Sequence, residues 1–358
     1  MKKIVLTGGG TAGHVTPNIA LLPALQAAGY EIAYVGSYEG IEKKLIADFN
    51  IPYTGISTGK FRRYLDPKNF SDPFRVMKGF VEARNYLKNF QPDVVFSKGG
   101  FVSVPVVRAA ASLHIPCIIH ESDMTPGLAN KLCIPVAEKV CCNFPETMKN
   151  IPADKAVLTG SPIRAELAQG SKLAGLNMCG FTANKPVIMV IGGSLGAANV
   201  NKAVRDALPK LLDDFQVVHL CGKDKIDNLL LNTPGYKQFE YIKAELKDIF
   251  AMADIVISRA GANAICELLA LKKPNILIPL PAASSRGDQL LNAASFEAQG
   301  YSIVLNEDDI TTNLLVDKVH ELYFNRQNYV DAMSRSHQMD AVKTIMELIN
   351  TAADKKTN

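Results

Sequence analysis

The stretch IVLTGGGTAGHVTP, residues 4–17, decides the fold that we expect for this chain. It reads as a short apolar strand, a glycine loop and a helix with Pro17 in its first turn, where the fixed φ of proline suits a helix start. Gly8, Gly10 and Gly13 match the dinucleotide fingerprint, in which bare backbone N–H groups and the positive end of a helix dipole attract an anion. The stretch therefore predicts a strand-loop-helix unit that binds a ligand at the carboxyl edge of a parallel sheet.

A second glycine loop, GGSLG at residues 192–196, follows an apolar run. Short apolar runs alternate with helical patterns along the chain, which predicts parallel sheets joined by helical crossovers. The runs expected to be strands are residues 4–6, 32–35, 94–96, 117–119, 187–191, 217–220, 255–257 and 276–278. The sequence thus predicts an α/β chain of two Rossmann-like, doubly wound parallel-sheet domains.

We expect the domain boundary at a Gly/Pro break, residues 159–162. At roughly 150 residues per domain, the 358 residues correspond to about two domains. The first is predicted over residues 1–159 and the second over residues 160–337. Apolar residues at helical spacing predict a last helix over residues 338–352.

Composition narrows the class of protein. The 39 Lys and Arg against 35 Asp and Glu give a formal net charge of +4, which favours a small-molecule substrate or an anionic surface over nucleic acid. The seven cysteines are odd in number and lack metal-ligand spacing, so we expect reduced thiols in a cytosolic compartment. The first residues do not resemble a signal peptide, and no apolar run approaches the roughly 18 residues of a spanning helix. We expect a protein that is soluble or lies on a membrane surface.

His14 is the first candidate for chemistry, because it follows the glycine loop at the edge where open α/β folds bind ligands. A lone histidine is more often a packing or capping residue, but in a phosphate-type loop it is well suited to act as a base near neutral pH. A nicotinamide cofactor would favour an acid at the end of the second strand, where this chain has Gly36 and Ser37. The pattern counts against such a cofactor without excluding it.

Polar residues further along form a candidate nucleotide-sugar site. Ser194 can donate its hydroxyl to a phosphate or simply cap a helix. Glu267, early in an expected helix, can accept ribose hydroxyls, although a surface helix glutamate is the commoner case. Gln289 suits sugar hydroxyls, because an amide both donates and accepts. Arg164 is a candidate pyrophosphate ligand, or an ordinary surface charge.

Several segments occur in one order from residue 8 to about residue 300. They are GGGTAGHVTP (8–17), KGGFVSVP (98–105), HESD (120–123), GLAN (127–130), GSPIR (160–164), GGSLGA (192–197) and residues 259–267. Together they resemble the MurG family, bacterial transferases that add N-acetylglucosamine from UDP-N-acetylglucosamine to undecaprenyl-pyrophosphoryl-N-acetylmuramyl-pentapeptide (lipid I).

The resemblance implies a GT-B fold, with two Rossmann-like domains facing a cleft and the last helix packing back on the first domain. It implies an inverting transfer to the muramyl 4-hydroxyl, giving lipid II, with His14 as the preferred base and Glu121 as the alternative. At position 123 this chain has aspartate where some members have an asparagine that contacts the donor sugar. Donor binding is implied for Thr11, Ala12, Gly13, Asp123, Arg164, Ser194, Ile242, Ala262, Asn263, Ala264, Glu267 and Gln289. No Asp-x-Asp motif stands near these loops, so we expect no metal ion and no cofactor.

Residues 56–90 carry eight basic residues against three acidic ones, interleaved with aromatic residues. Such a run is usually a solvated helix with an apolar core face, but it also suits a surface that meets anionic lipid. A lipid-linked acceptor favours the membrane interpretation, so we expect a peripheral protein on the cytoplasmic face of the bacterial cell membrane. The acceptor and membrane contacts are predicted at Arg62, Arg63, Phe74, Arg75 and Lys78.

Three other functions remain open from the sequence. A nucleotide-sugar epimerase of the same fold would need no lipid acceptor. An NAD-dependent oxidoreductase would use the first glycine loop. A non-catalytic nucleotide-sugar binding module would keep the UDP site without the base.

Overall fold

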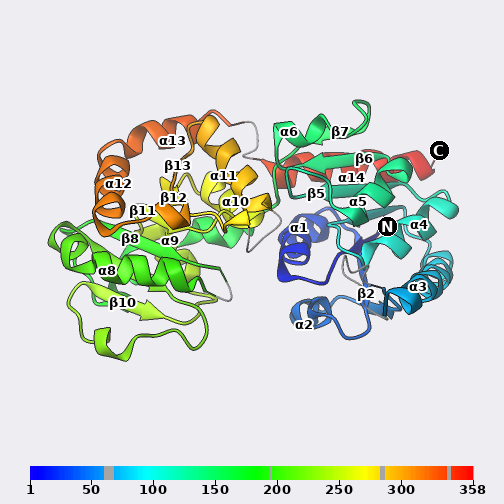
Figure 1. Cartoon of the computed structure of the whole chain (residues 1–358). Helices are drawn as coiled ribbons and strands as arrows, with labels where there is room; N and C mark the ends of the chain where they lie inside the picture. Colours follow the sequence, from blue (N-terminus) through cyan, green and yellow to red (C-terminus); the bar gives the residue numbers. More distant parts are fainter. Residues whose placement is uncertain (60–67, 194–195, 283–286, 337–339, 358) are drawn as a thin grey trace. The chain divides into compact units, whose positions relative to one another are not determined.

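The structure is a computed structural model of the chain (Figure 1), and it describes residues 1–59, 68–193, 196–282, 287–336 and 340–357. The chain forms two compact units. Unit 1 comprises Met1–Arg164 together with Asp340–Asn358, and unit 2 comprises Ala165–Met339. Because unit 1 is built from two separate stretches, unit 2 is an insertion within it.

Unit 1 is built on a seven-stranded parallel sheet with strand order β3-β2-β1-β4-β5-β6-β7. The strands are β1 (Lys3–Thr7), β2 (Glu31–Ser37), β3 (Tyr53–Ile56), β4 (Val94–Ser97), β5 (Cys117–Glu121), β6 (Lys139–Cys142) and β7 (Ala156–Leu158). Strand β1 pairs with both β2 and β4, so Ile4 is opposite Ile32 on one side and Val94 on the other. These central residues are almost fully buried, as expected for a parallel sheet with helices on both faces.

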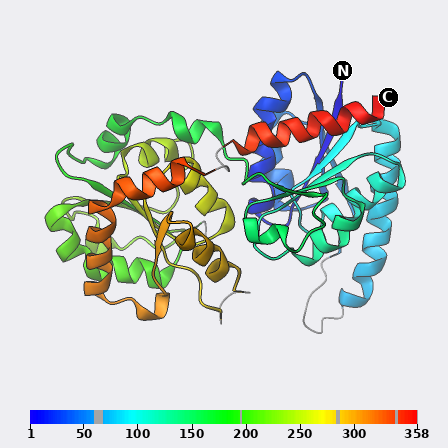
Figure 2. The same cartoon turned by 90° about the horizontal axis from the view of Figure 1, so that it is seen from above.

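Helices and short 3₁₀ turns connect the strands of unit 1. They are η1 (Ala12–His14), α1 (Thr16–Ala27), α2 (Ile41–Ile46), η2 (Ala47–Phe49), α3 (Lys68–Phe90), α4 (Ser103–Ser112), α5 (Leu128–Cys133), η3 (Ile134–Val136), α6 (Pro145–Met148) and α14 (Ala341–Thr357). One apolar core contains residues of α3, α4 and the sheet, and a second contains residues of α1 and α14. Ile345, Ile349 and Ala353 of α14 are fully buried in that second core, and Figure 2 shows α14, in red, beside the blue helix α1. The end of the chain therefore completes the core of unit 1.

Unit 2 is built on a six-stranded parallel sheet with strand order β10-β9-β8-β11-β12-β13. The strands are β8 (Val187–Ile191), β9 (Gln216–Leu220), β10 (Tyr236–Phe239), β11 (Ile255–Ser258), β12 (Asn275–Leu277) and β13 (Ser302–Val304). Strand β8 is central, and Ile188 is opposite Val217 in β9 and Ile255 in β11.

Unit 2 has its own helices, coloured from green to orange in Figure 1. They are η4 (Ala165–Gln169), α7 (Lys172–Cys179), α8 (Ala198–Asp214), η5 (Asn228–Leu230), α9 (Leu246–Met252), α10 (Ala262–Ala270), α11 (Asp288–Ala298), η7 (Glu307–Asp309), α12 (Thr312–Phe324) and α13 (Arg326–Ser334). Helices α8 and α12 pack on one face of the sheet through buried residues such as Val204, Leu211 and Val319. Unit 2 thus has a core independent of unit 1.

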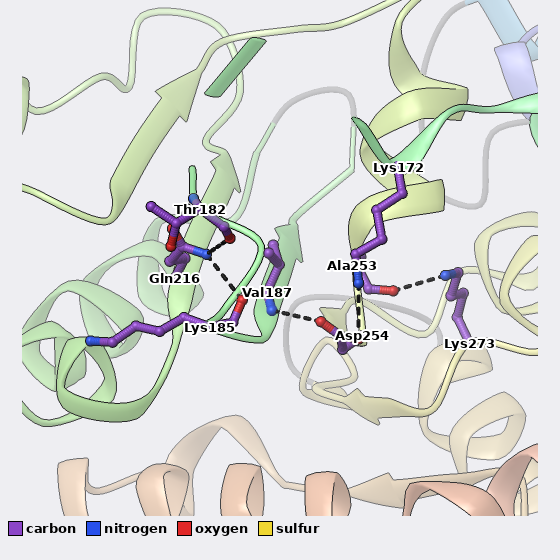
Figure 3. Close-up of polar contacts among 8 residues, drawn as sticks. All are labelled: Lys172, Thr182, Lys185, Val187, Gln216, Ala253, Asp254 and Lys273. Carbon is purple, nitrogen blue, oxygen red and sulfur yellow. Dashed lines mark hydrogen bonds and ion pairs between the residues drawn. The ribbon is translucent and has the colours of Figure 1, made fainter. Parts of the chain in front are cut away.

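Polar side chains fix the amino ends of the unit 2 strands (Figure 3). Asp254 accepts a hydrogen bond from the Val187 backbone at 2.8 Å, and Lys273 donates to the Ala253 carbonyl at 2.8 Å. Gln216 donates to the Lys185 carbonyl at 3.0 Å. These contacts satisfy backbone groups before the strands begin. Helix α10 begins at the opposite, carboxyl edge of the sheet, directly after β11.

The predicted α/β class with two doubly wound parallel sheets is confirmed, and all eight predicted strands occur. Pro17 lies in the first turn of α1, as expected. The last helix extends to Thr357, five residues past the predicted end, because Ala352 and Ala353 continue its buried face. Within the described ranges, no helix is long and apolar enough to cross a membrane.

Candidate functional site

The first glycine loop joins β1 to α1 and places His14 at the carboxyl edge of the unit 1 sheet. A Cβ atom at Gly8 would lie 2.5 Å from the carbonyl oxygen of His14, so only glycine permits this close approach. Gly10 has a φ of +84°, a conformation that favours glycine. Thr11 follows as the exposed N-cap of η1, and His14 is the last residue of that turn.

Hydrogen bonds to the His14 ring determine which nitrogen can act as a base. Nδ1 lies 3.1 Å from the Gly9 carbonyl oxygen and 3.1 Å from Thr11 Oγ1. A carbonyl oxygen only accepts, so the neutral ring carries its proton on Nδ1 and its lone pair on Nε2. Burial and the nearby Lys98 ammonium lower the pKa of His14 from 6.5 to about 4. At neutral pH the imidazole is uncharged and can accept a proton at Nε2.

A buried lysine supplies positive charge beside this loop. Lys98 follows β4 and is 1% exposed, and its ammonium lies 2.8 Å from His120 Nδ1 and also donates to Ser122 Oγ. His120 Nε2 lies 2.9 Å from the Gly160 carbonyl oxygen, so Nε2 holds the proton and Nδ1 accepts from Lys98. Burial, together with the Lys98 charge, lowers the pKa of His120 well below its ordinary value.

Glu121, the alternative base, lies at the end of β5 and is 4% exposed. Its Oε1 accepts from the Asp123 backbone at 2.9 Å, and its Oε2 accepts from the Gly127 backbone at 3.0 Å. The Asn130 side chain donates to Oε2 as well, at 2.9 Å. A carboxylate engaged in this way holds the loop that follows β5, so the geometry favours His14 over Glu121 as the proton acceptor.

In unit 2, helix α10 presents its N-terminus at the carboxyl edge of the sheet, directly after β11. Gly261 is the N-cap, and Ala262, Asn263 and Ala264 form the first turn. The first backbone N–H groups of a helix have no intrahelical acceptor and attract anions. Glu267 is the sixth helical residue and is half-buried. The arrangement suits a diphosphate at the helix end with ribose hydroxyls near Glu267.

Two side chains hold the segments around α10. Arg259, 8% exposed, forms a buried ion pair with Glu307 and donates to the Pro279 carbonyl at 3.2 Å. Gln289, in the first turn of α11, accepts from the Leu280 backbone at 3.1 Å. The carbonyl oxygen of Gln289 therefore supports the chain after β12, and its amide N–H groups are the part suited to a sugar.

Of the remaining predicted residues, some are described by the structure and others are not. Ile242 is buried in the segment between β10 and α9, and Arg164 is half-buried at the last position of the first stretch of unit 1. Ser194, Arg62 and Arg63 lie outside the residues that the structure describes.

Helix α3 exposes an apolar stripe with basic neighbours. Phe74, Met77 and Val81 are 78%, 63% and 52% exposed, and their spacing of three and four residues places them on one side of the helix. Arg75 and Lys78 are also exposed. Exposed apolar residues grouped in this way are typical of an interaction surface.

Lys98 and Glu42 are two buried charged residues beside the unit 1 loops for which no role is predicted from the sequence. Lys98 stands directly after an apolar strand, which is a detectable signal for a residue at the ligand edge. Glu42 lies in the short helix α2, where nothing in the local pattern distinguishes it from a surface residue.

Two doubly wound parallel-sheet units in one chain are the architecture of the GT-B class of folds, to which nucleotide-sugar glycosyltransferases belong. The Glycosyltransferase family 28 N-terminal domain matches residues 4–142, and the Glycosyltransferase family 28 C-terminal domain matches residues 187–349. The chain belongs to glycosyltransferase family 28.

Individual relatives agree with this assignment. The chain is 65% identical over 349 residues to the UDP-N-acetylglucosamine--N-acetylmuramyl-(pentapeptide) pyrophosphoryl-undecaprenol N-acetylglucosamine transferase of Lachnospira eligens, covering 98% of this chain and 99% of that protein. The crystal structure of Acinetobacter baumannii MurG is 28% identical, with a TM-score of 0.77 over 98% of this chain and 100% of that one. A putative UDP-N-acetylglucosamine 2-epimerase from Listeria monocytogenes has a TM-score of 0.72 over 99% and 98% of the two chains, but at 13% identity it shares the fold alone. The resemblance to the MurG family is confirmed.

Proposed function

We propose that this chain transfers N-acetylglucosamine from UDP-N-acetylglucosamine to the 4-hydroxyl of the muramyl sugar of lipid I, giving lipid II for peptidoglycan synthesis. The observation that carries this conclusion is the 65% identity, over 98% of the chain, to a transferase of that name. The epimerase alternative has only a distant structural likeness behind it. An NAD-dependent oxidoreductase is likewise not favoured by any of these relatives.

In the proposed reaction, His14 removes the proton from the attacking hydroxyl. Its Nδ1–H donates to the Gly9 carbonyl, which fixes the ring and leaves the Nε2 lone pair as the proton acceptor. The 4-hydroxyl oxygen forms a bond to the anomeric carbon as the bond from that carbon to UDP breaks, so the configuration inverts. General-base assistance of this kind contributes on the order of a hundred to ten-thousand-fold to the rate.

Negative charge then develops on the departing diphosphate. We assign its stabilisation to the N-terminus of α10, with Ser194 and Arg164 as further donors, and the ribose hydroxyls to Glu267. Gln289 is assigned to the sugar, because the Leu280 backbone holds its oxygen and an amide N–H can donate to a sugar hydroxyl. Unit 2 is accordingly the UDP-sugar unit, and unit 1 supplies the base and the acceptor contacts.

The acceptor is lipid-linked, and the stripe on α3 gives unit 1 a surface suited to lipid. Phe74 and Met77 can enter the boundary between headgroups and acyl chains while Arg75 and Lys78 meet anionic headgroups. We therefore propose a peripheral protein at the cytoplasmic face of the bacterial membrane.

Turnover is tested with labelled UDP-N-acetylglucosamine and a short-chain lipid I analogue. We expect transfer to the lipid that requires both substrates, and no release of an epimerised nucleotide sugar. His14→Gln should lower kcat by at least about a hundredfold while UDP affinity, measured by calorimetry, changes by less than about twofold. Epimerisation without acceptor, or NADH binding seen by fluorescence, would support the rival functions instead.

Membrane association is tested by sedimentation with vesicles containing phosphatidylglycerol. The double variant Arg75→Glu, Lys78→Glu should lose most vesicle binding, since each basic residue contributes about 1 kcal/mol near an anionic surface. Lys223→Glu, Arg335→Glu, the same two changes at exposed sites of unit 2, is the matched control and should bind as the parent does. Equal binding by all three proteins contradicts the assignment of this surface.

A further inference from the structure

Glu42 lies fully buried against the first glycine loop, with 0% exposure. Its Oε2 accepts a hydrogen bond from the Gly10 backbone at 3.2 Å. Its Oε1 accepts from the Ser37 backbone at 2.9 Å and from the Ser37 hydroxyl. One carboxylate from α2 therefore joins the loop after β1 to the end of β2.

The packing around this carboxylate is close. A Cβ atom added at Gly9 would lie 2.5 Å from Glu42 Cδ, and one added at Gly40 would lie 2.1 Å from Glu42 Oε1. At Gly36 an added Cβ would lie 2.8 Å from Glu42 Cγ. Three glycines thus make room for one side chain, and the Gly10 N–H that could meet a phosphate is already bonded to an acidic group of the protein itself.

The loop is held at three successive residues. The Tyr34 hydroxyl donates to the Gly8 carbonyl oxygen at 2.7 Å. The Gly9 carbonyl oxygen receives the His14 ring at 3.1 Å, and Glu42 receives the Gly10 N–H. The Gly9 carbonyl and the Gly10 N–H belong to one peptide group, so the group that orients His14 is itself held by Glu42.

We propose that Glu42 is an internal anion that occupies the phosphate position of the first glycine loop and, by fixing Gly9 and Gly10, positions His14. It is a positioning residue, because it acts on His14 through the loop. The inference deepens the proposed function, and it rests on that function only for its effect on turnover. It explains why a loop with the dinucleotide fingerprint does not need a dinucleotide: the negative charge that the loop attracts is built into the chain.

The first test replaces Glu42 by glutamine. In the parent protein the two carboxylate oxygens of Glu42 accept from three donors, whereas the side chain of Glu42→Gln has one accepting oxygen. The loop therefore loses a hydrogen bond although the volume of the side chain is unchanged. We expect kcat to fall by about tenfold or more, with the KM for UDP-N-acetylglucosamine changed by less than about twofold. Ser37→Ala, which removes only one donor, should cause a smaller fall in kcat. Glu39→Gln, the same charge change at a neighbouring exposed position, should leave kcat unchanged.

The second test is chemical rescue. Glu42→Ala leaves a space next to the Gly10 and Ser37 donors, and sodium formate or acetate should restore kcat several-fold where sodium chloride at equal ionic strength does not. Unchanged kcat in Glu42→Gln, or an equal response to formate and chloride in Glu42→Ala, overturns the proposal.

A readout that does not depend on turnover separates this inference from the proposed function. The ¹⁵N chemical shifts of the His14 ring report which nitrogen carries the proton. The parent should show the Nδ1–H form, and Glu42→Gln should show a mixture of both forms. If the tautomer is unchanged in the variant, Glu42 does not position His14. If the tautomer changes but the parent transfers no sugar, the proposed function fails and the positioning role stands.

Discussion

Activity at mildly acidic pH is the sharpest test of the His14 assignment. An imidazole with the ordinary pKa of 6.5 would be only about 9% neutral at pH 5.5. His14, whose pKa is lowered to about 4 by burial and by Lys98, would be about 97% neutral at the same pH. We therefore expect kcat/KM to be nearly constant from about pH 7.5 down to pH 5.5 and to fall by half only near pH 4.

The assay is direct separation of labelled lipid product, because coupling enzymes fail in acid. Lys98→Met removes the second cause of the lowered His14 pKa but leaves burial, the first. The pH at which kcat/KM falls by half, the midpoint of the acid limb, should therefore move part of the way from about 4 towards 6.5. Lys88→Met, a change at an exposed position of α3, should leave the limb in place. An acid limb near 6.5 in the parent protein would refute the reasoning, since His14 would then be an ordinary solvated histidine.

The lowered pKa also affects stability. In the unfolded chain His14 binds a proton below about pH 6.5, whereas in the folded chain it does so only below about pH 4. Stability from this group is therefore complete above 6.5 and lost as the pH falls from 6.5 to 4, by at most about 3.4 kcal/mol. The unfolding free energy of the parent should therefore fall, relative to that of His14→Gln, as the pH is lowered from 6.5 to 4.

Three further predictions concern a buried ion pair, a close glycine contact and the buried cysteines. Arg259→Ala should lower the free energy of unfolding by about 3–5 kcal/mol in urea, because it leaves the buried Glu307 carboxylate without its positive partner, with only the Asn199 amide still donating to it; adding Glu307→Gln should recover part of the loss. Gly79→Ala should cost about 2–3 kcal/mol, since the new Cβ would lie 1.9 Å from the Ser57 carbonyl oxygen, and an unchanged melting temperature would contradict this packing. The seven cysteines are all buried, and burial raises the pKa of Cys133 to about 12, so the native protein should react with a thiol reagent only when it unfolds; rapid labelling before denaturant is added would show that a thiol is accessible.

The strands that the sequence predicted and those it missed differ in position. Five strands were missed: the sheet edges β3, β7, β10 and β13, and β6, an inner strand of only four residues that begins with Lys139. A central parallel strand is buried on both faces and reads as an apolar run, which the sequence reveals directly. An edge strand such as β10, with sequence YKQF, is short and partly polar, so its pairing depends on neighbours that no local pattern shows.

The candidate site divides in the same way. The glycine loop and His14 were visible, because the fingerprint and the residue that follows it are contiguous in sequence. Glu42 was missed, because it reaches the loop from another element and is identified by its contacts alone. Lys98 was given no role, although its place directly after an apolar strand was a usable signal. The roles of the donor residues and of Glu121 stay predictions that mutagenesis has to test.

Helix α14 has a consequence for how the chain is made. Unit 1 keeps Ile345 and Ile349 in a core that begins with Ile4, more than three hundred residues earlier, while unit 2 is contiguous. During synthesis, unit 2 can therefore reach its native state while unit 1 still lacks helix α14, which covers part of its core. A nascent chain halted before residue 340 would carry a folded unit 2 and an unfinished unit 1, exposing apolar surface that chaperones recognise.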